Sequence, residues 1–293
     1  MKANRCSSIE AATEPWATDD RGDFTVPARS YLRDRHDMEQ LIVASDARSA
    51  ADDKLPGLSV FLPAHNEAPN VERVVRGFVD QLPRFARDWE IIVVDDGSRD
   101  ATGEIADHLA ASDPHVKVVH HPINRGYGAA VISGVRAATL PFVLLADGDG
   151  QFEPSDIGLL AARAATHDVV VGRRITRADN LLRRLNGRAW TTLVRLLFGL
   201  KIHDIDCGFK LFRRELLDGL VLRANGAVIS TELMARLAAR HARVCEVGVK
   251  HLPRLAGEQS GANLKVIAKA FAELFALYRE LSSEKGDSMR KPR

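Results

Sequence analysis

The residues best suited to chemistry lie in the segment FVLLADGDGQF, where Asp147 and Asp149 directly follow an apolar run. In a continuing strand the two carboxylates would share one face, whereas Gly148 and Gly150 allow a tight turn that gathers both around one point. The Gln151 amide completes this set of hard oxygen ligands, which suits Mg²⁺ or Mn²⁺ and a substrate diphosphate. The motif predicts a metal and diphosphate site, with an ordinary Asp-Gly turn as the alternative.

Two further acidic turns follow apolar runs earlier in the chain. The first run ends in PAHNE, where Pro63 has no N–H group and Glu67 adds a carboxylate, unlike a glycine-rich phosphate loop. The second run ends in DDGSRD, which places Asp95 and Asp96 side by side. Both turns are interpreted as a wall that accepts hydrogen bonds from a nucleoside base and ribose. Capping of the following helices is the alternative at each turn.

Basic residues gather between positions 173 and 195, which hold seven arginines and one acid, Asp179. Guanidinium groups bind phosphate oxygens bidentately, and arginines interleaved with Leu and Trp also suit an anionic lipid surface. The hypothesis is a phosphate or membrane contact, and a solvated basic helix face is the alternative for some of these arginines.

The elements that must position these residues alternate between strand and helix. Short β-branched runs predict buried strands at residues 58–65, 89–96, 116–121, 142–147 and 168–173. Stretches with helical spacing between them predict helices at residues 70–82, 101–111, 126–138 and 154–165. This alternation predicts an α/β fold with a mostly parallel sheet and helices on both faces. In such sheets ligands bind beyond the carboxyl ends of the strands, which is where the acidic turns lie.

The remaining segments define the predicted domain organisation. Residues 1–55 are expected to form a mostly flexible arm, apart from a short helical pattern at residues 38–43. Residues 56–258 form the predicted main domain, and residues 259–293 an amphipathic helix and tail. After residue 174 the pattern predicts further pieces of the main domain, namely helices at 181–200 and 230–241 and a strand at 243–251.

Composition narrows the class of protein. The 293 residues carry 41 Lys and Arg against 39 Asp and Glu, so no uniform charge favours nucleic acid as a partner. Cys6, Cys207 and Cys245 form no CxxC pair, which argues against a disulfide framework and favours a reducing cytoplasm. The N-terminal segment is interpreted as neither a signal peptide nor an anchor, and no apolar run reaches the roughly 18 residues of a spanning helix.

Six motifs, in this order over residues 57–255, resemble those of the family 2 glycosyltransferases: PAHNE, VVDDGSRD, NRGYGAA, DGDGQ, VGRR and DIDCGFK. More narrowly, they are similar to the dolichyl or polyprenyl phosphate mannosyl- and glucosyltransferases. The resemblance implies the GT-A fold and an inverting transfer of a hexose from a nucleotide-diphosphate sugar of the GDP-mannose or UDP-glucose class. It also implies Mg²⁺ or Mn²⁺ as cofactor and a polyprenyl phosphate acceptor, met by a cytoplasmic protein at the inner membrane surface.

The resemblance implies roles for individual residues. The sugar donor would be held by Pro63, Ala64, Glu67, Asp95, Asp96, Asp147, Gly148, Gln151 and Glu232. The metal ligands would be Asp147, Asp149 and Gln151, and the acceptor phosphate would meet Arg174, Arg183 and Arg184. Asp149 and Arg174 are the predicted catalytic residues.

Two positions depart from the pattern of many relatives. Tyr127 stands where those relatives have a lysine, and Cys207 stands where they often have a serine. Cys207 is therefore expected to be a packed small residue instead of a nucleophile.

The catalytic base and the reaction class leave alternatives open. Four histidines near turns, at positions 65, 120, 121 and 203, are expected to lack a partner. That would suit a lipid phosphate, which is already anionic and needs no strong base. A soluble hydroxyl acceptor would need one, with Asp204 or Asp206 as the weak candidate. A nucleotidyltransferase, which usually needs a glycine-rich first loop, and a non-catalytic nucleotide-sugar-binding protein are the other hypotheses.

Overall fold

The computed structural model describes residues 54–175, 181–254 and 264–290. The chain divides into two units, Met1–Ala50 and Ala51–Arg293, and the description concerns the second. Residues 1–53 of the predicted arm, including the helical pattern at residues 38–43, lie outside the described residues. Its last two residues, Lys54 and Leu55, are described and belong to the second unit.

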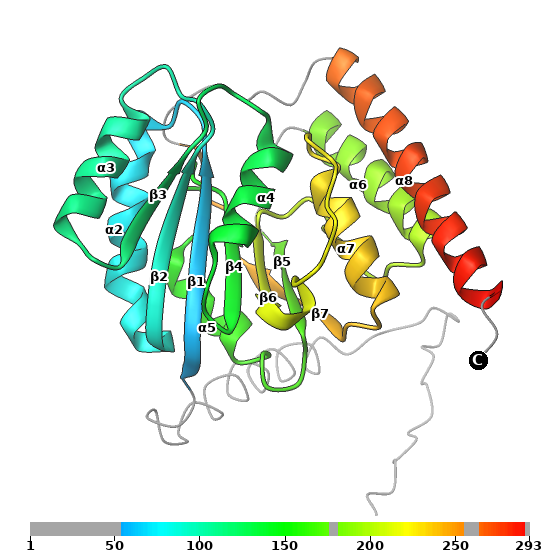
Figure 1. Cartoon of the computed structure of the whole chain (residues 1–293), viewed down its shortest axis with the longest axis horizontal. Helices are drawn as coiled ribbons and strands as arrows, with labels where there is room; N and C mark the ends of the chain where they lie inside the picture. Colours follow the sequence, from blue (N-terminus) through cyan, green and yellow to red (C-terminus); the bar gives the residue numbers. More distant parts are fainter. Residues whose placement is uncertain (1–53, 176–180, 255–263, 291–293) are drawn as a thin grey trace, which may run out of the picture. The chain divides into compact units, whose positions relative to one another are not determined.

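The described residues form one seven-stranded sheet in the order β3-β2-β1-β4-β6-β5-β7 (Figure 1). Its strands are β1 (Leu55–Ala64), β2 (Ala86–Asp95), β3 (Val116–His120), β4 (Phe142–Ala146), β5 (Val169–Arg174), β6 (Phe209–Arg213) and β7 (Val244–Val249). Every neighbouring pair is parallel except the two pairs that involve β6. The predicted α/β fold with a mostly parallel sheet is confirmed.

Helices cover both faces of the sheet (Figure 1). They are α2 (Ala68–Phe85), α3 (Thr102–Ser112), α4 (Tyr127–Ala137), α5 (Ile157–Ala161), α6 (Leu181–Phe198), α7 (Ile229–Ala239) and α8 (Leu264–Arg290), with short 3₁₀ turns η2 (Pro154–Asp156) and η3 (Arg214–Leu216). None of these helices in the described ranges is long and apolar enough to cross a membrane.

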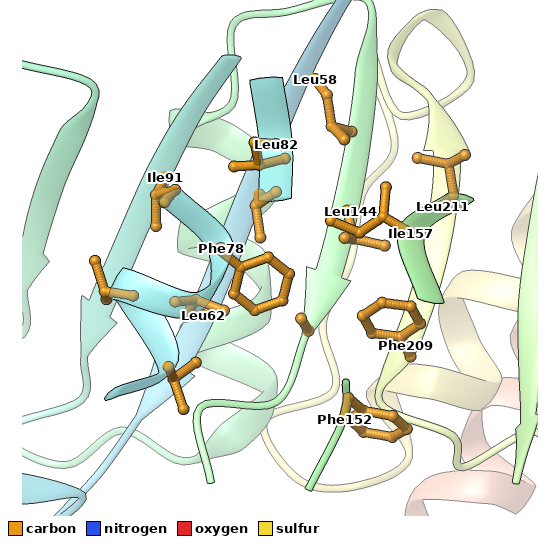
Figure 2. Close-up of a cluster of buried hydrophobic side chains, with 14 of the residues drawn as sticks. Leu58, Leu62, Phe78, Leu82, Ile91, Leu144, Phe152, Ile157, Phe209 and Leu211 are labelled. Atoms are coloured by element: carbon orange, nitrogen blue, oxygen red, sulfur yellow. The ribbon is translucent and has the colours of Figure 1, made fainter. Parts of the chain in front are cut away.

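Alternating strand residues divide the core into two layers. Leu62 on β1 and Ile91 on β2 face α2, where they pack with Phe78 and Leu82 (Figure 2). The intervening Phe61 points to the other face, which is covered by α4, α6 and α7. This alternation follows from the two-residue period of a strand, and full burial on both faces explains why the strands are continuous apolar runs.

Three elements differ from the sequence-based expectation. Strand β6 was not predicted, because its five residues include Lys210 and Arg213 and therefore lack a β-branched apolar run. The helix predicted at residues 154–165 is a 3₁₀ turn followed by the five-residue α5. The last helix, α8, continues to Arg290, so helix occupies most of the region predicted at residues 259–293 as a helix and tail.

The strand order creates a switch point between β1 and β4. The chain passes from β1 outward to β2 and β3, and then returns to place β4 on the other side of β1. Helices that leave the two sides of such a point diverge, so a crevice opens beyond the carboxyl ends of the strands. The turns after β1 and β4 lie at this point.

Candidate active site at the carboxyl edge of the sheet

Asp147 is the first residue after β4, and polar and charged groups surround its carboxylate. The Tyr127 hydroxyl, at the start of α4, donates a hydrogen bond to Asp147 Oδ1 at 2.8 Å. Burial raises the pKa of Asp147, while Tyr127 and the charge of the fully buried Lys210 oppose that rise. Burial and Asp147 raise the pKa of Tyr127 well above its ordinary value, so Tyr127 remains a neutral hydrogen-bond donor.

Asp149 lies two residues further along the same turn. Its Oδ1 atom accepts a hydrogen bond from the Gln151 backbone N–H at 3.0 Å. Burial and the nearby Asp147 carboxylate raise the pKa of Asp149 to about 6. Burial and a neighbouring carboxylate both disfavour the charged form of Asp149, and a cation bound beside the two acids would offset this cost.

Gln151 connects this turn to the segment after β7. Its side-chain Nε2 donates to the Leu252 carbonyl oxygen at 3.0 Å, and the Leu252 N–H donates to the Gln151 carbonyl oxygen at 2.8 Å. The structure thus uses Gln151 to fix residues 252–254 beside the acidic turn. Its predicted contact with a metal stays a prediction.

Arg254 was not identified from the sequence, and this segment places it between two acids. Its guanidinium group donates a hydrogen bond to Glu67 Oε1, and its Nη1 atom lies 3.7 Å from Asp149 Oδ2. Arg254 therefore connects the turn after β1 with the turn after β4. The sequence offered one signal for Arg254, its position shortly after the end of β7. Because β7 is parallel to β5, residues after β7 reach the same edge of the sheet as those after β5.

Glu67 is buried at the start of α2. Its second oxygen, Oε2, accepts a hydrogen bond from Asn70 Nδ2 at 2.7 Å. Burial raises the pKa of Glu67, and the contacts with Asn70 and Arg254 oppose this rise. Through Arg254, Glu67 is therefore linked to the acidic turn after β4.

The turns after β1 and β4 touch through glycine. A Cβ atom on Gly148 would lie 2.8 Å from the carbonyl oxygen of Pro63, and 3.6 Å from the Cβ atom of Ala64. Gly150 has φ +73°, and a Cβ atom there would lie 2.1 Å from Arg73 Nη2. The glycines of the motif therefore permit close packing as well as the turn, and the structure brings Pro63, Ala64 and Gly148 together.

Asp96 organises the loop between β3 and α4. Its Oδ1 accepts from the Arg125 N–H at 2.9 Å and lies 2.6 Å from His121 Nδ1, while its Oδ2 accepts from the Gly126 N–H at 2.8 Å. Asp95 accepts from the Ser98 N–H at 3.0 Å. The two acids hold loops beside the crevice, and their contacts with a nucleoside stay predictions.

The expectation that the four histidines lack partners was wrong. Three of them pair with carboxylates that the sequence did not place near them: His121 with Asp96, His120 with Asp95 and Asp107, and His203 with Glu246. His121 Nε2 also lies 2.8 Å from Ser133 Oγ. The fourth, His65, has its Nδ1 atom 3.0 Å from the Asp96 carbonyl oxygen.

Arg174 ends β5 and forms a two-point ion pair with Asp204. Its Nε and Nη2 atoms donate to the Asp204 carboxylate at 2.8 and 2.7 Å. This contact holds the pKa of Arg174 above its ordinary value, although burial alone would lower it. Asp204 is therefore the partner of Arg174, and it is poorly placed to act as the base suggested for a hydroxyl acceptor. Arg183 and Arg184 lie in α6, and their side chains lie outside the described residues.

Glu232, on α7, uses both carboxylate oxygens within the protein. Oε2 accepts from the N–H groups of Arg223 and Ala224 at 2.9 and 2.8 Å, and Oε1 accepts from Arg236 Nε at 2.9 Å. This contact fixes the segment whose Asn225 carbonyl oxygen receives the Gly128 N–H at 2.9 Å. Glu232 thus supports the start of α4, and its contact with a sugar stays a prediction.

The site fits a divalent cation only if the substrate supplies further ligands. In the described ranges, no group of three or more His, Cys, Asp or Glu side chains is arranged to hold a metal ion. Asp147 and Asp149 provide two carboxylates, and burial together with the charge of Asp147 raises the pKa of Asp149 to about 6.

Cys207 is fully buried with a pKa of about 12, raised by burial, which agrees with a packing role.

Comparison with known proteins identifies similar chains. Residues 59–221 match the family described as glycosyl transferase family 2. Two curated relatives are undecaprenyl-phosphate 4-deoxy-4-formamido-L-arabinose transferases, from Pectobacterium atrosepticum (30% identical) and Pseudomonas aeruginosa (32% identical). Each match covers 73% of this chain, but only 65% and 63% of the respective relative. The chain thus spans slightly less than two thirds of their length.

Solved structures show the same fold. Glucosyl-3-phosphoglycerate synthase from Mycobacterium tuberculosis, in complex with phosphoglyceric acid, has a TM-score of 0.57 at 22% identity, and the match covers 76% of both chains. The same enzyme in complex with Mn²⁺, UDP and glucosyl-3-phosphoglycerate has a TM-score of 0.55 at 22% identity, again over 76% of both chains. These likenesses confirm the fold predicted from the motifs.

Proposed function

Because the chain belongs to glycosyl transferase family 2, we propose that it moves a hexose from a nucleotide-diphosphate sugar to a polyprenyl phosphate, with inversion at the sugar. The names of the curated relatives support the lipid-phosphate acceptor. The solved neighbours in complex with UDP and UDP-glucose support a donor of the UDP-glucose class over one of the GDP-mannose class.

The pairing of the two acidic turns is the observation that best supports this proposal. Asp147 and Asp149 after β4 lie opposite Glu67 after β1, and Arg254 contacts both turns. Acids on both sides of the switch point suit a metal-bound diphosphate on one side and a nucleoside on the other. Pro63 and Ala64 would line the nucleoside side, with Glu67, Asp95 and Asp96 behind them.

A divalent cation would be held by Asp147 and Asp149. Bound there, Mg²⁺ or Mn²⁺ would stabilise the negative charge that develops on the departing diphosphate. Tyr127 orients Asp147 through its 2.8 Å hydrogen bond, and Arg254 adds positive charge beside Asp149. A Mn²⁺ ion in complexes of the solved neighbours supports the presence of a metal, and Gln151 is retained as a third ligand in the proposal.

The acceptor phosphate would approach from the side of β5. Arg174 ends that strand, and Arg183 and Arg184 follow in the first turn of α6. A phosphate acceptor is already anionic and needs no base, which agrees with the ion pair that occupies Asp204. The arginine-rich stretch 173–195 would meet the lipid at the inner membrane surface.

A soluble hydroxyl acceptor is the second candidate. The solved neighbours in complex with phosphoglyceric acid favour it, because that acceptor is soluble and offers a hydroxyl group. Such a reaction requires a base, for which Asp204 would first have to leave Arg174.

Product detection with a panel of sugar donors tests the proposal. The full chain is incubated with UDP-hexoses and GDP-mannose, with undecaprenyl phosphate or phosphoglyceric acid, and lipid and soluble products are identified by mass spectrometry. We expect a lipid-linked hexose that forms only with Mg²⁺ or Mn²⁺. Asp147→Ala and Asp149→Ala should each lower turnover at least about 100-fold, or roughly 2.7 kcal/mol of transition-state stabilisation. Full activity in EDTA, or transfer to phosphoglyceric acid alone, would contradict it.

A further inference from the structure

Helix α8 exposes an aromatic stripe to solvent. Phe271 and Tyr278 are each 39% exposed, and Phe275 between them is 52% exposed. Their spacing of four and three residues places the three rings on one side of the helix. The residues that anchor α8 to the domain, Leu277 and Leu281, are buried. The helix therefore has one apolar side that packs on the domain and a second apolar side that is open.

The open side of α8 continues onto α6. Phe271 packs edge-to-face on Trp190 with ring centroids 5.5 Å apart, and Tyr278 packs edge-to-face on Phe198 at 5.9 Å. The two helices therefore run side by side in the same direction (Figure 1). Phe271, Phe275 and Tyr278, with Trp190 and Phe198 packed beside them, are called the α6–α8 face.

Basic side chains are also exposed on these helices. Arg195 on α6, Arg279 on α8 and Lys201 beyond the end of α6 are all exposed. The acids of α8 are less exposed: Glu273 is partly buried, and Glu280, at 27%, pairs with Arg223 and Arg236. The described exposed charges of the two helices are therefore mainly cationic.

We propose that the α6–α8 face docks on an anionic lipid bilayer. Aromatic side chains on one side of a helix, together with exposed Arg and Lys, match the chemistry of the boundary between headgroups and acyl chains. A second copy of the chain fits less well. A two-fold contact through the same face would bring the cations Arg195 and Arg279 of each copy toward those of the other.

The position of the face agrees with a lipid acceptor, and the choice of a bilayer as the partner rests on the proposed function. Helix α6 begins seven residues after Arg174, and α8 begins ten residues after Arg254. Figure 1 shows both helices starting at the end of the sheet to which the arrow of β1 points, which is the edge where the candidate site lies. Docking through their sides would bring the site to the edge of the membrane contact, within reach of a membrane-embedded lipid phosphate.

Flotation with vesicles tests the docking surface. The full chain is mixed with vesicles of phosphatidylglycerol and phosphatidylcholine in equal parts, and with vesicles of phosphatidylcholine alone. The test variant replaces two exposed members of the face, Phe271→Ser with Phe275→Ser. The matched control is Leu159→Ser, because Leu159 is 45% exposed on α5, away from the face.

We expect the wild type and the control to float with the anionic vesicles, and less so as salt rises from about 0.1 M to about 1 M. The double variant should bind at least about tenfold more weakly, because it removes apolar area from the contact. Equal thermal unfolding of all three proteins shows that the loss is not a folding defect. Equal binding by the double variant, or no binding by the wild type, overturns the proposal.

Two further readouts separate the alternatives. Light scattering without lipid reports self-association, and a dimer that the double variant alone converts to a monomer would assign the face to a second copy and overturn the proposal. Transfer to a short-chain polyprenyl phosphate in detergent should be equal in all three proteins. If no protein transfers sugar but the vesicle result is as expected, the proposed function fails and the docking surface stands.

Discussion

Replacing Gly208 with Ala should displace Asp147 in the turn after β4 without replacing a charged residue. Gly208 lies beneath Asp147, whose N–H donates to the Gly208 carbonyl oxygen at 3.0 Å. A Cβ atom at Gly208 would lie 1.8 Å from Asp147 Oδ2 and 2.1 Å from its Cγ atom. Gly208 does not have the positive φ that strains other residues, so the clash with Asp147 is the main consequence of the substitution.

The size of the effect follows from this clash. Asp147 Oδ2 must move by about 1.2 Å to reach even a 3.0 Å contact with the new methyl group, and that movement disrupts the hydrogen bond from Tyr127. Misplacement of a catalytic group by about 1 Å costs about 100-fold in rate, so kcat/KM should fall about 100-fold. Mn²⁺ affinity should fall with it, because one of two protein carboxylates has left its position.

Transfer kinetics and calorimetric Mn²⁺ titration measure the two effects. Gly226→Ala is the matched control, because its methyl group would meet its nearest atom, Glu273 Oε2, at an ordinary 3.4 Å. The melting temperature shows whether both variants are folded. The reasoning is refuted if folded Gly208→Ala keeps kcat/KM within about twofold of the wild type.

Three further predictions follow from the charges of the described residues. Mn²⁺ affinity should weaken about tenfold as the pH falls from about 7 to about 5, because Asp149, with a pKa of about 6, takes up a proton that competes with the metal. A Mn²⁺ affinity that stays constant across this pH range in calorimetry would contradict this prediction. Arg254→Gln should weaken the binding of a nucleoside diphosphate more than Arg254→Lys does, because Arg254 brings positive charge to Asp149 and Glu67. Equal affinities of the two variants would exclude this charge effect. Glu90→Gln should lower the melting temperature by roughly 3 °C or more at neutral pH. Burial would raise the pKa of Glu90, but hydrogen bonds from Lys117, Ser59 and Thr139 lower it to about 2. The stabilisation of the fold by Glu90 is therefore present above the ordinary pKa of 4.5 and is lost as the pH falls toward 2. A wild-type melting temperature that falls in acid no more than that of Glu90→Gln would argue against this prediction.

The sheet was predictable because its signal is local. Buried parallel strands are continuous apolar runs, and five of them between Leu58 and Arg173 are predictable from their short β-branched apolar runs. Since the carboxyl ends of parallel strands share one edge, the sequence also predicts that the acidic turns lie together. Strand β6 was not predicted because its Lys210 is fully buried, and a hydropathy pattern does not predict burial for a lysine.

The contacts that complete the site were not predictable, because they join distant parts of the chain. Arg254 is 187 residues from Glu67, and nothing near either residue indicates the pairing. His121 is 25 residues from Asp96, and only the parallel pairing of β2 with β3 brings their strands together. Partners of charged side chains are thus set by the sheet order, whereas the turns that hold them are set by local sequence.

The most direct test of the candidate site is an anomalous difference map from crystals grown with Mn²⁺ and UDP, recorded near the manganese absorption edge. We expect a peak bound by Asp147 and Asp149, with the diphosphate as the remaining ligand and the uridine on the side of Pro63 and Glu67. A peak elsewhere, or a nucleotide bound in the crevice with no manganese beside Asp149, would contradict it.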